Sequence, residues 1–302
     1  MRRVLRRMLG RIASSNLAQA ERYFAVRQWQ DALLRFTVAS AVAPKSEAAW
    51  LGLARTYLSM ERPKGALRAL RRLREMGYAT HDEVVYLTAL AEKNGAPETM
   101  PLALVKRYFD AAAPEFDRDR IAVNDYQGYR VLAERVRPLL AAGRSDHAVL
   151  DLGVGTGQCG SLLRDVAATL TGVDVAPSML EEAARRKMYD RLVEAEVVAY
   201  MQATDGRYDV VLAAGVASYI GDLSGFYRGA ARVLKPGGLL AFSADMLESD
   251  EGYAFDMQDH WFRFSRAYLQ KLAADNGFSE KLITQAPTYP AYNAWFCVFQ
   301  KS

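Results

Sequence analysis

The stretch that most constrains this chain is residues 149–157, which read Val-Leu-Asp-Leu-Gly-Val-Gly-Thr-Gly. A short apolar run ends close to an acidic residue, and three glycines then follow at every second position. A helical pattern begins directly afterwards, at Gln158. The pattern predicts a strand, a glycine-rich turn and a helix, an arrangement that lets the backbone of an α/β sheet come very close to a bound nucleotide.

Strands and helices alternate from this turn onward. The expected strands are 148–152, 169–174, 192–196, 208–213, 238–243, 281–287 and 294–299. The expected helices lie near 158–167, 177–187, 196–203, 222–234 and 265–276. Such alternation predicts a mainly parallel sheet that is covered on both faces. Few residues separate the last two strands, which is typical of an antiparallel pair at a sheet edge.

The first hundred residues follow a different pattern, with a period of 34 residues counted from Ala13 and again from Glu47. Small residues recur where paired helices approach closely, and large ones recur where the gaps are filled: Ala20, Ala54, Ala32 and Ala66, then Tyr23, Tyr57, Phe36 and Leu70. This resembles the tetratricopeptide (TPR) repeat, with two units. A further helix at about 82–92 would cover the apolar edge of the stack. A plain helical bundle is the alternative.

The charge of the chain is divided unevenly. Residues 1–100 carry 17 Lys and Arg against 9 Asp and Glu, whereas residues 101–302 carry 22 against 26. The first part is therefore basic, at +8, and suits an acidic protein partner. Nucleic acid is a less favoured partner, because no basic ribbon is interleaved with aromatic residues.

Cysteine, histidine and hydropathy patterns exclude several classes. The two cysteines and three histidines are scattered, so we expect neither a disulfide scaffold nor a metal centre. No apolar run reaches the roughly 18 residues of a membrane span. We therefore expect a cytoplasmic protein that does not cross a membrane.

The identity of the nucleotide depends on two acidic residues. Residues 155–160 formally match the dinucleotide pattern G-x-G-x-x-G, and no Gly-Lys-Ser/Thr of a P-loop follows. Asp151 lies where a pyrophosphate would require hydrogen-bond donors, so it favours a ligand with an ammonium group and no phosphate, such as S-adenosylmethionine. Asp174 ends the second strand, where an acid accepts from ribose hydroxyls in either kind of site.

Four motifs occur in a familiar order: D-x-G-x-G-x-G at 151–157, Gly-Val-Asp at 172–174, Tyr-Asp-Val-Val at 208–211 and Leu-Lys-Pro-Gly-Gly at 234–238. With them the chain resembles the class I S-adenosylmethionine-dependent methyltransferases, and more narrowly the bacterial group with an N-terminal TPR domain. The resemblance implies an α/β fold, with a Rossmann-like, seven-stranded, mostly parallel sheet and one antiparallel edge strand, preceded by an all-α domain. It implies a TPR-like domain at 1–95, a linker with cofactor-covering helices at 96–147 and a methyltransferase domain at 148–302.

The resemblance also assigns residues to the cofactor. They lie on the glycine turn, the strand ends and a covering helix: Phe109, Asp151, Gly153, Val154, Gly155, Gly157, Asp174, Val175, Met179, Glu196, Val197, Ala213 and Ala214. Asp151 is expected to hold the methionine part and Asp174 the ribose. Glu196 and the amide of Val197 are expected to contact the adenine, and Ala213 with Ala214 to line the floor beneath the sulfonium.

The acceptor side departs from the family. Gly215 stands where an acid is common after the fourth strand, and residues 261–265 are aromatic where a basic pair is usual. Trp261, Phe262 and Tyr219 are expected to form an aromatic wall there. The candidate catalytic residues are His260 as a base, with Tyr219 and Tyr126 reaching the site.

Three functions remain open. The first is methyl transfer to a small-molecule or carrier- or peptide-bound acceptor, with S-adenosylhomocysteine as product and the TPR-like domain aiding recruitment. The second uses S-adenosylmethionine itself as substrate, by an intramolecular displacement that releases methylthioadenosine. The third is a TPR interaction module whose S-adenosylmethionine-binding domain has a regulatory or scaffold role.

Overall fold

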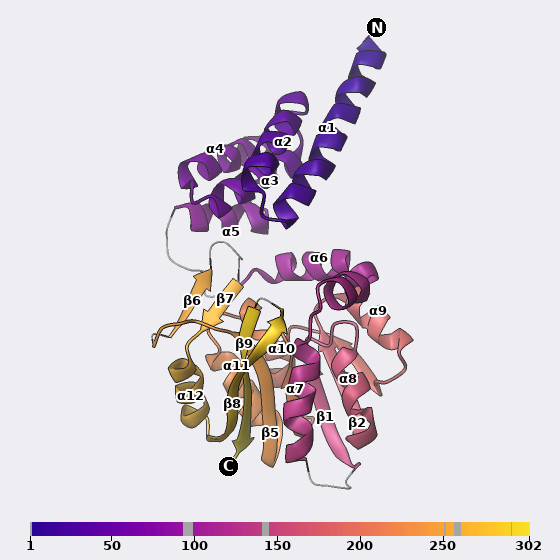
Figure 1. Cartoon of the computed structure of the whole chain (residues 1–302), viewed down its shortest axis with the longest axis vertical. Coiled ribbons are helices and arrows are strands. Elements are labelled where there is room, and N and C mark those ends of the chain that lie inside the picture. Colours follow the sequence, from indigo (N-terminus) through magenta and orange to yellow (C-terminus); the bar gives the residue numbers. More distant parts are fainter. Residues whose placement is uncertain (1, 93–98, 141–144, 251, 257–260, 291) are drawn as a thin grey trace. The chain divides into compact units, whose positions relative to one another are not determined.

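The computed structural model describes residues 2–92, 99–140, 145–250, 252–256, 261–290 and 292–302 (Figure 1). The chain forms two compact units. One comprises the N-terminal helices, and the other spans Glu98–Phe255 with Trp261–Ser302.

The N-terminal unit is all helical. Its elements are α1 (Arg2–Ala25), α2 (Trp29–Val42), α3 (Glu47–Ser59), α4 (Pro63–Leu73), the π-helical turn η1 (Arg74–Tyr78) and α5 (Asp82–Ala91). Each α-helix packs against the next one in the chain. Local signals set the helix starts, because the Ser46 side chain caps α3 by accepting from the Ala49 amide, and Pro63 opens α4.

The predicted repeat is confirmed by the core of this unit. The small residues at its repeat positions are completely buried, at 0% exposure: Ala20, Ala32, Ala54 and Ala66. Phe36 is buried beside Gly52, where an added Cβ would lie 2.2 Å from the ring. Residues one period apart also meet, since Arg55 pairs with Glu21 at 3.0 Å and His81 with Glu47 at 3.2 Å. The repeated units therefore stack side by side in register.

The second unit is built on a seven-stranded sheet. Its strands are β1 (His147–Leu152), β2 (Ala167–Asp174), β3 (Arg191–Glu194), β4 (Tyr208–Ala213), β5 (Leu234–Asp245), β8 (Phe278–Tyr289) and β9 (Tyr292–Lys301). They lie in the order β3-β2-β1-β4-β5-β9-β8. The first five are parallel, whereas β9 runs antiparallel to both neighbours. The expected fold class is confirmed, with the β8–β9 antiparallel pair at the edge and β8 outermost.

Helices cover both faces of this sheet (Figure 1). On one face α7 (Gly128–Val136) and α8 (Gln158–Leu163) pack against side chains such as Val149 and Val210. On the other face α10 (Val197–Ala203), α11 (Ser224–Val233) and α12 (Arg266–Asp275) pack against side chains such as Leu150 and Phe242. Because both faces are buried, the central strands are apolar almost throughout, as is usual in parallel sheets.

A two-stranded sheet, β6 (Tyr253–Asp256) with β7 (Trp261–Phe264), was not predicted from the sequence. In β7, Phe262 is fully buried and its ring contacts the rings of Tyr253 and Phe255. The expectation that Phe262 forms an acceptor wall is therefore wrong, because strand alternation turns this residue into the core.

Candidate cofactor and acceptor site

The glycine turn lies at the point where the strand order reverses, between β1 and β4. Ligands of open α/β sheets bind at such a switch point, outside the carboxyl ends of the strands. Gly153, Gly155 and Gly157 have φ of +66°, +52° and +86°. A Cβ on Gly153 would lie 2.3 Å from Cγ2 of Val216, so both its backbone conformation and its surroundings require glycine.

Asp174 connects the end of β2 to this turn. One of its carboxylate oxygens accepts from the Gly155 amide at 2.9 Å, and the other accepts from the Ala176 amide at 2.9 Å. Burial raises the pKa of Asp174 above its ordinary value, while these backbone donors oppose the rise. The carboxylate thus stabilises the turn and lies beside the place predicted for the ribose.

Asp151 is buried beneath the turn and bonds to a residue that sequence reasoning missed. Its carboxylate accepts from the Tyr189 hydroxyl at 2.6 Å, and the same hydroxyl accepts from the Gly160 amide at 3.0 Å. Burial raises the pKa of Asp151 to about 7, despite the opposing hydrogen bond from Tyr189. The carboxylate therefore titrates near neutrality.

Tyr189 occupies space that three glycines leave open. A Cβ added to Gly157 would lie 3.1 Å from the Tyr189 ring. One added to Gly160 would lie 2.4 Å from the Tyr189 hydroxyl, and one added to Gly172 would lie 3.0 Å from the ring. Glycines beyond the 151–157 turn, at 160 and 172, were the available signal that a large side chain fills this region.

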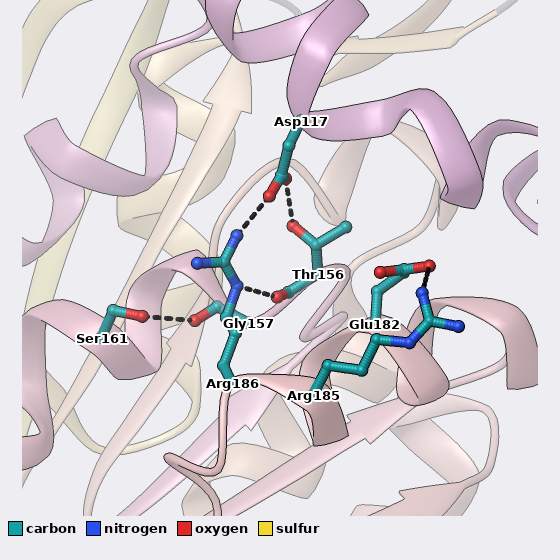
Figure 2. Close-up of polar contacts among 7 residues, drawn as sticks. All are labelled: Asp117, Thr156, Gly157, Ser161, Glu182, Arg185 and Arg186. Carbon is teal, nitrogen blue, oxygen red and sulfur yellow. Dashed lines mark hydrogen bonds and ion pairs between the residues drawn. The ribbon is translucent and has the colours of Figure 1, made fainter.

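A segment before the sheet is bonded to the glycine turn (Figure 2). It comprises α6 (Leu102–Ala112), η2 (Ala113–Glu115) and η3 (Asp117–Val123), which we call the covering segment. Asp117 accepts from the Thr156 hydroxyl at 2.6 Å and pairs with Arg186, whose Nε donates to the Thr156 carbonyl at 2.6 Å. These contacts hold the covering segment over the carboxyl end of β1.

Further contacts place the covering segment beside β2. Lys106 donates to the Val175 carbonyl at 3.2 Å, and Asp110 accepts from the Ser178 amide at 3.1 Å. The helix that begins there, α9 (Pro177–Arg185), contributes Met179 to an apolar cluster with Ala113, Ala176 and Phe109. The structure thus brings Phe109, Val175 and Met179 together around the end of β2.

The remaining predicted cofactor residues lie on α10 and β4. Glu196 caps α10, because its carboxylate accepts from the amides of Val198 and Ala199 at 2.9 and 2.6 Å. Val197 is buried in the core, Ala213 ends β4 fully buried, and Ala214 is half-buried. Contacts of these residues with a cofactor stay a prediction.

Tyrosines gather at the carboxyl end of β4. A Cβ on Gly215 would lie 2.9 Å from the Tyr126 hydroxyl, and the ring centroids of Tyr126 and Tyr289 are 5.1 Å apart. The Tyr219 ring lies 5.4 Å from that of Phe109. Burial raises the pKa of Tyr219 to about 12 and raises that of Tyr126 well above its ordinary value. Both phenols are therefore protonated at neutral pH and can donate hydrogen bonds.

Other expected acceptor residues are only partly described. His260, the candidate base, lies outside the described residues. Trp261 is half-buried, and its indole nitrogen has no hydrogen-bond partner. The described residues hold no group of three or more His, Cys, Asp or Glu placed to bind a metal ion. In the same part of the chain, no helix has the length and apolar content that crossing a membrane requires.

Comparisons with known proteins agree with this architecture. Residues 150–242 match a family model described as a methyltransferase domain, and residues 13–91 match a tetratricopeptide repeat model. A malonyl-[acyl-carrier protein] O-methyltransferase of Enterobacter lignolyticus is 32% identical over 177 residues, 56% of this chain and 67% of the relative. This chain belongs to the class I S-adenosylmethionine-dependent methyltransferases and carries an N-terminal TPR region.

Two other similarities define the extent of the match. A demethylmenaquinone methyltransferase of Tropheryma whipplei is 29% identical over 140 residues, 46% of this chain, and the match spans 57% of that relative's length. The crystal structure of magnesium protoporphyrin IX methyltransferase from Synechocystis PCC 6803 with bound S-adenosylhomocysteine has a TM-score of 0.54 at 16% identity. That match covers 67% of this chain and 99% of the solved one, and shows a common fold.

Proposed function

We propose that this chain transfers a methyl group from S-adenosylmethionine to a small-molecule or carrier-bound acceptor and releases S-adenosylhomocysteine. The observation that carries the proposal is the bond between Asp174 and the Gly155 amide, which joins the end of β2 to the glycine turn at the switch point. Membership of the methyltransferase family supports the same assignment.

In the proposed complex, the amides of the turn and Asp151 hold the methionine part, and Asp174 accepts from the ribose hydroxyls. Phe109 and Met179 enclose the nucleoside from the covering segment and α9. Glu196 and Val197 lie nearest the adenine, and Ala213 with Ala214 lie beneath the sulfonium. The covering segment would exclude water once the cofactor is bound.

Methyl transfer from a sulfonium is an in-line displacement, so holding the donor and acceptor in line supplies much of the catalysis. Tyr126 and Tyr219 are the residues that we assign to acceptor positioning. Because their phenols stay protonated, they would orient the acceptor by donating hydrogen bonds. His260 remains a candidate base for an acceptor that must lose a proton.

Product analysis tests the reaction. The protein is incubated with S-adenosylmethionine, with and without a cell extract, and the products are identified by mass spectrometry. Methyl transfer predicts S-adenosylhomocysteine that depends on the extract. Methylthioadenosine formed without any acceptor would instead support the intramolecular displacement. Cofactor binding with neither product would favour a regulatory or scaffold role.

Recruitment of an acidic carrier protein is a second proposal, carried by the surface of α4. Lys64, Arg68 and Arg71 follow a spacing that places them on one stripe of the helix, and all three are exposed. The name of the malonyl-[acyl-carrier protein] relative supports a carrier as the partner.

The free, buried cysteines Cys159 and Cys297 fit a reducing compartment such as the cytoplasm.

Charge reversal tests recruitment in the full chain. Replacing Lys64, Arg68 and Arg71 with Glu should weaken binding of holo acyl carrier protein by about tenfold or more, because the steering field changes sign. The matched control reverses exposed cations elsewhere in the same unit, at Arg11, Arg22 and Lys45. Equal binding by the two triple variants would contradict a role for α4.

A further inference from the structure

Arg120 differs from the other arginines around the glycine turn. Arg118, two residues earlier, pairs with Glu115 at 2.7 Å and Asp119 at 2.9 Å, and Arg186 pairs with Asp117. Among the described residues, by contrast, no carboxylate forms an ion pair with Arg120. Yet Arg120 is half-buried, where a guanidinium without a counterion is costly.

The contacts of Arg120 are aromatic. Its Nη1 donates to the Tyr289 hydroxyl at 3.2 Å, and its guanidinium carbon lies 5.7 Å from the centroid of the Tyr108 ring. A planar guanidinium has five donors, so these contacts leave most of its donors for a ligand. The fork of donors matches the two oxygens of a carboxylate.

The same region contains the tyrosines of the acceptor side. The Tyr289 hydroxyl accepts from Arg120, and the Tyr289 ring is tilted by 41° against that of Tyr126, whose hydroxyl lies at Gly215 beyond β4. Burial raises the pKa of Tyr219, and the charge of Arg120 opposes that rise, so Arg120 is also close to Tyr219. One cation and three phenols therefore surround the end of β4, and the Asp245 carboxylate at the end of β5 lies close enough to Tyr126 and Tyr219 to act on both phenols.

We propose that Arg120 binds a carboxylate of the acceptor and that the product is a methyl ester. This inference rests on the proposed methyl transfer. A carboxylate oxygen attacks the methyl carbon, the new C–O bond forms, and the S–C bond breaks with its electron pair going to sulfur. The anionic acceptor and the cationic sulfonium become a neutral ester and a neutral thioether, and no proton is transferred.

This chemistry accounts for two features of the site. A carboxylate is ionised at neutral pH, so the acceptor needs no base. Glycine is therefore tolerated at position 215, where an acid is common in the family. Asp245, the acid at the end of β5, accepts from the Ser218 hydroxyl. Protonated Tyr126 and Tyr219 donate hydrogen bonds, which suits an anionic acceptor.

Base lability of the product identifies the acceptor atom without knowledge of the acceptor. The full-length protein is incubated with S-adenosylmethionine labelled in the methyl group and a cell extract, and the product is treated with mild base. A methyl ester releases the label as volatile methanol, which is the expected result. Label that stays non-volatile, as in an ether or a methylamine, would overturn the inference while leaving the proposed methyl transfer intact. Absence of any transfer would overturn both.

Substitution at position 120 tests the residue. Arg120→Gln should raise the extract concentration needed for half-maximal transfer by about 10- to 100-fold, through loss of charge-assisted hydrogen bonds. Arg120→Lys should recover part of the lost apparent affinity, because lysine supplies the positive charge but not the paired donors of a guanidinium. Arg118→Gln, an exposed arginine in the same short helix η3, is the matched control and should behave as wild type.

Binding of S-adenosylhomocysteine separates this effect from a structural one. Its dissociation constant should be the same within twofold for wild type and Arg120→Gln. Wild-type transfer by Arg120→Gln would contradict the assignment. So would a joint loss of transfer and S-adenosylhomocysteine binding that Arg120→Lys does not restore.

Discussion

The carboxyl ends of β1 and β2 and the carboxyl ends of β4 and β5 are built in opposite ways. The first region is built around backbone amides and acids that are close in the sequence, such as Gly155 and Asp174. The second consists of side chains brought together only by folding, such as Arg120 and Tyr289. The difference teaches that the first region is specified largely by local spacing, whereas the second depends on contacts between residues that are far apart in the sequence.

The largest effect is expected at the cofactor side. Asp174→Ala should raise the dissociation constant for S-adenosylhomocysteine by about 100-fold, ~3 kcal/mol, because it removes charge-assisted bonds to the turn and to the ligand. Isothermal titration calorimetry measures it. Asp205→Ala, an exposed acid after α10, is the control and should leave binding unchanged. Equal affinities of the two variants would show that Asp174 does not bind the ribose.

A smaller effect is expected from Gly153→Ala. The new Cβ would lie 2.3 Å from Val216 at a φ of +66°, so unfolding in urea should show a loss of ~2 kcal/mol. Adding Val216→Ala should relieve the clash but not the backbone strain, and recover about half of the loss. No loss in the single variant would show that the turn adapts and that its shape is not fixed by this contact.

The most gradual expected effect is a pH dependence of stability from Asp151. Its pKa in the folded chain is about 7, against an ordinary 3.8. Between these values the native state holds a proton that the unfolded state releases. The stability contributed by this group is therefore full below about pH 4 and is lost as pH rises towards about 7, on the order of 1 kcal/mol per pH unit.

Asp151→Asn should remove this contribution. The difference in unfolding free energy between variant and wild type should therefore change between about pH 5 and about pH 7, and level off above that. Urea unfolding at several pH values measures the difference. A difference that is constant across this range would mean that the Asp151 pKa is not raised by burial beneath the turn.

The sequence predicted the sheet, the glycine turn and the repeat, but not the contacts between distant side chains. Strand ends, the glycine turn and the 34-residue repeat are periodic or local patterns, and they are confirmed by the sheet and by the buried alanines such as Ala54. Tyr189 was missed because it contacts Asp151 from 38 positions away. Phe262 was assigned to the wrong environment because a four-residue strand gives too short a pattern to fix which side chains face the core.

The hydrogen bond between Arg120 and Tyr289 joins residues 169 positions apart, and no local sequence pattern predicts it. It depends on how the covering segment meets the β8–β9 edge. Such long-range placements require the assembled fold, which is why the candidate residues taken from the sequence, His260, Tyr219 and Tyr126, did not include Arg120.

The most direct measurement is calorimetric titration of S-adenosylmethionine into the wild-type chain. We predict saturable binding at one site per chain, and displacement of the bound molecule by S-adenosylhomocysteine. No detectable binding of either compound to the folded protein would contradict the assignment of the glycine turn and Asp174 to this cofactor.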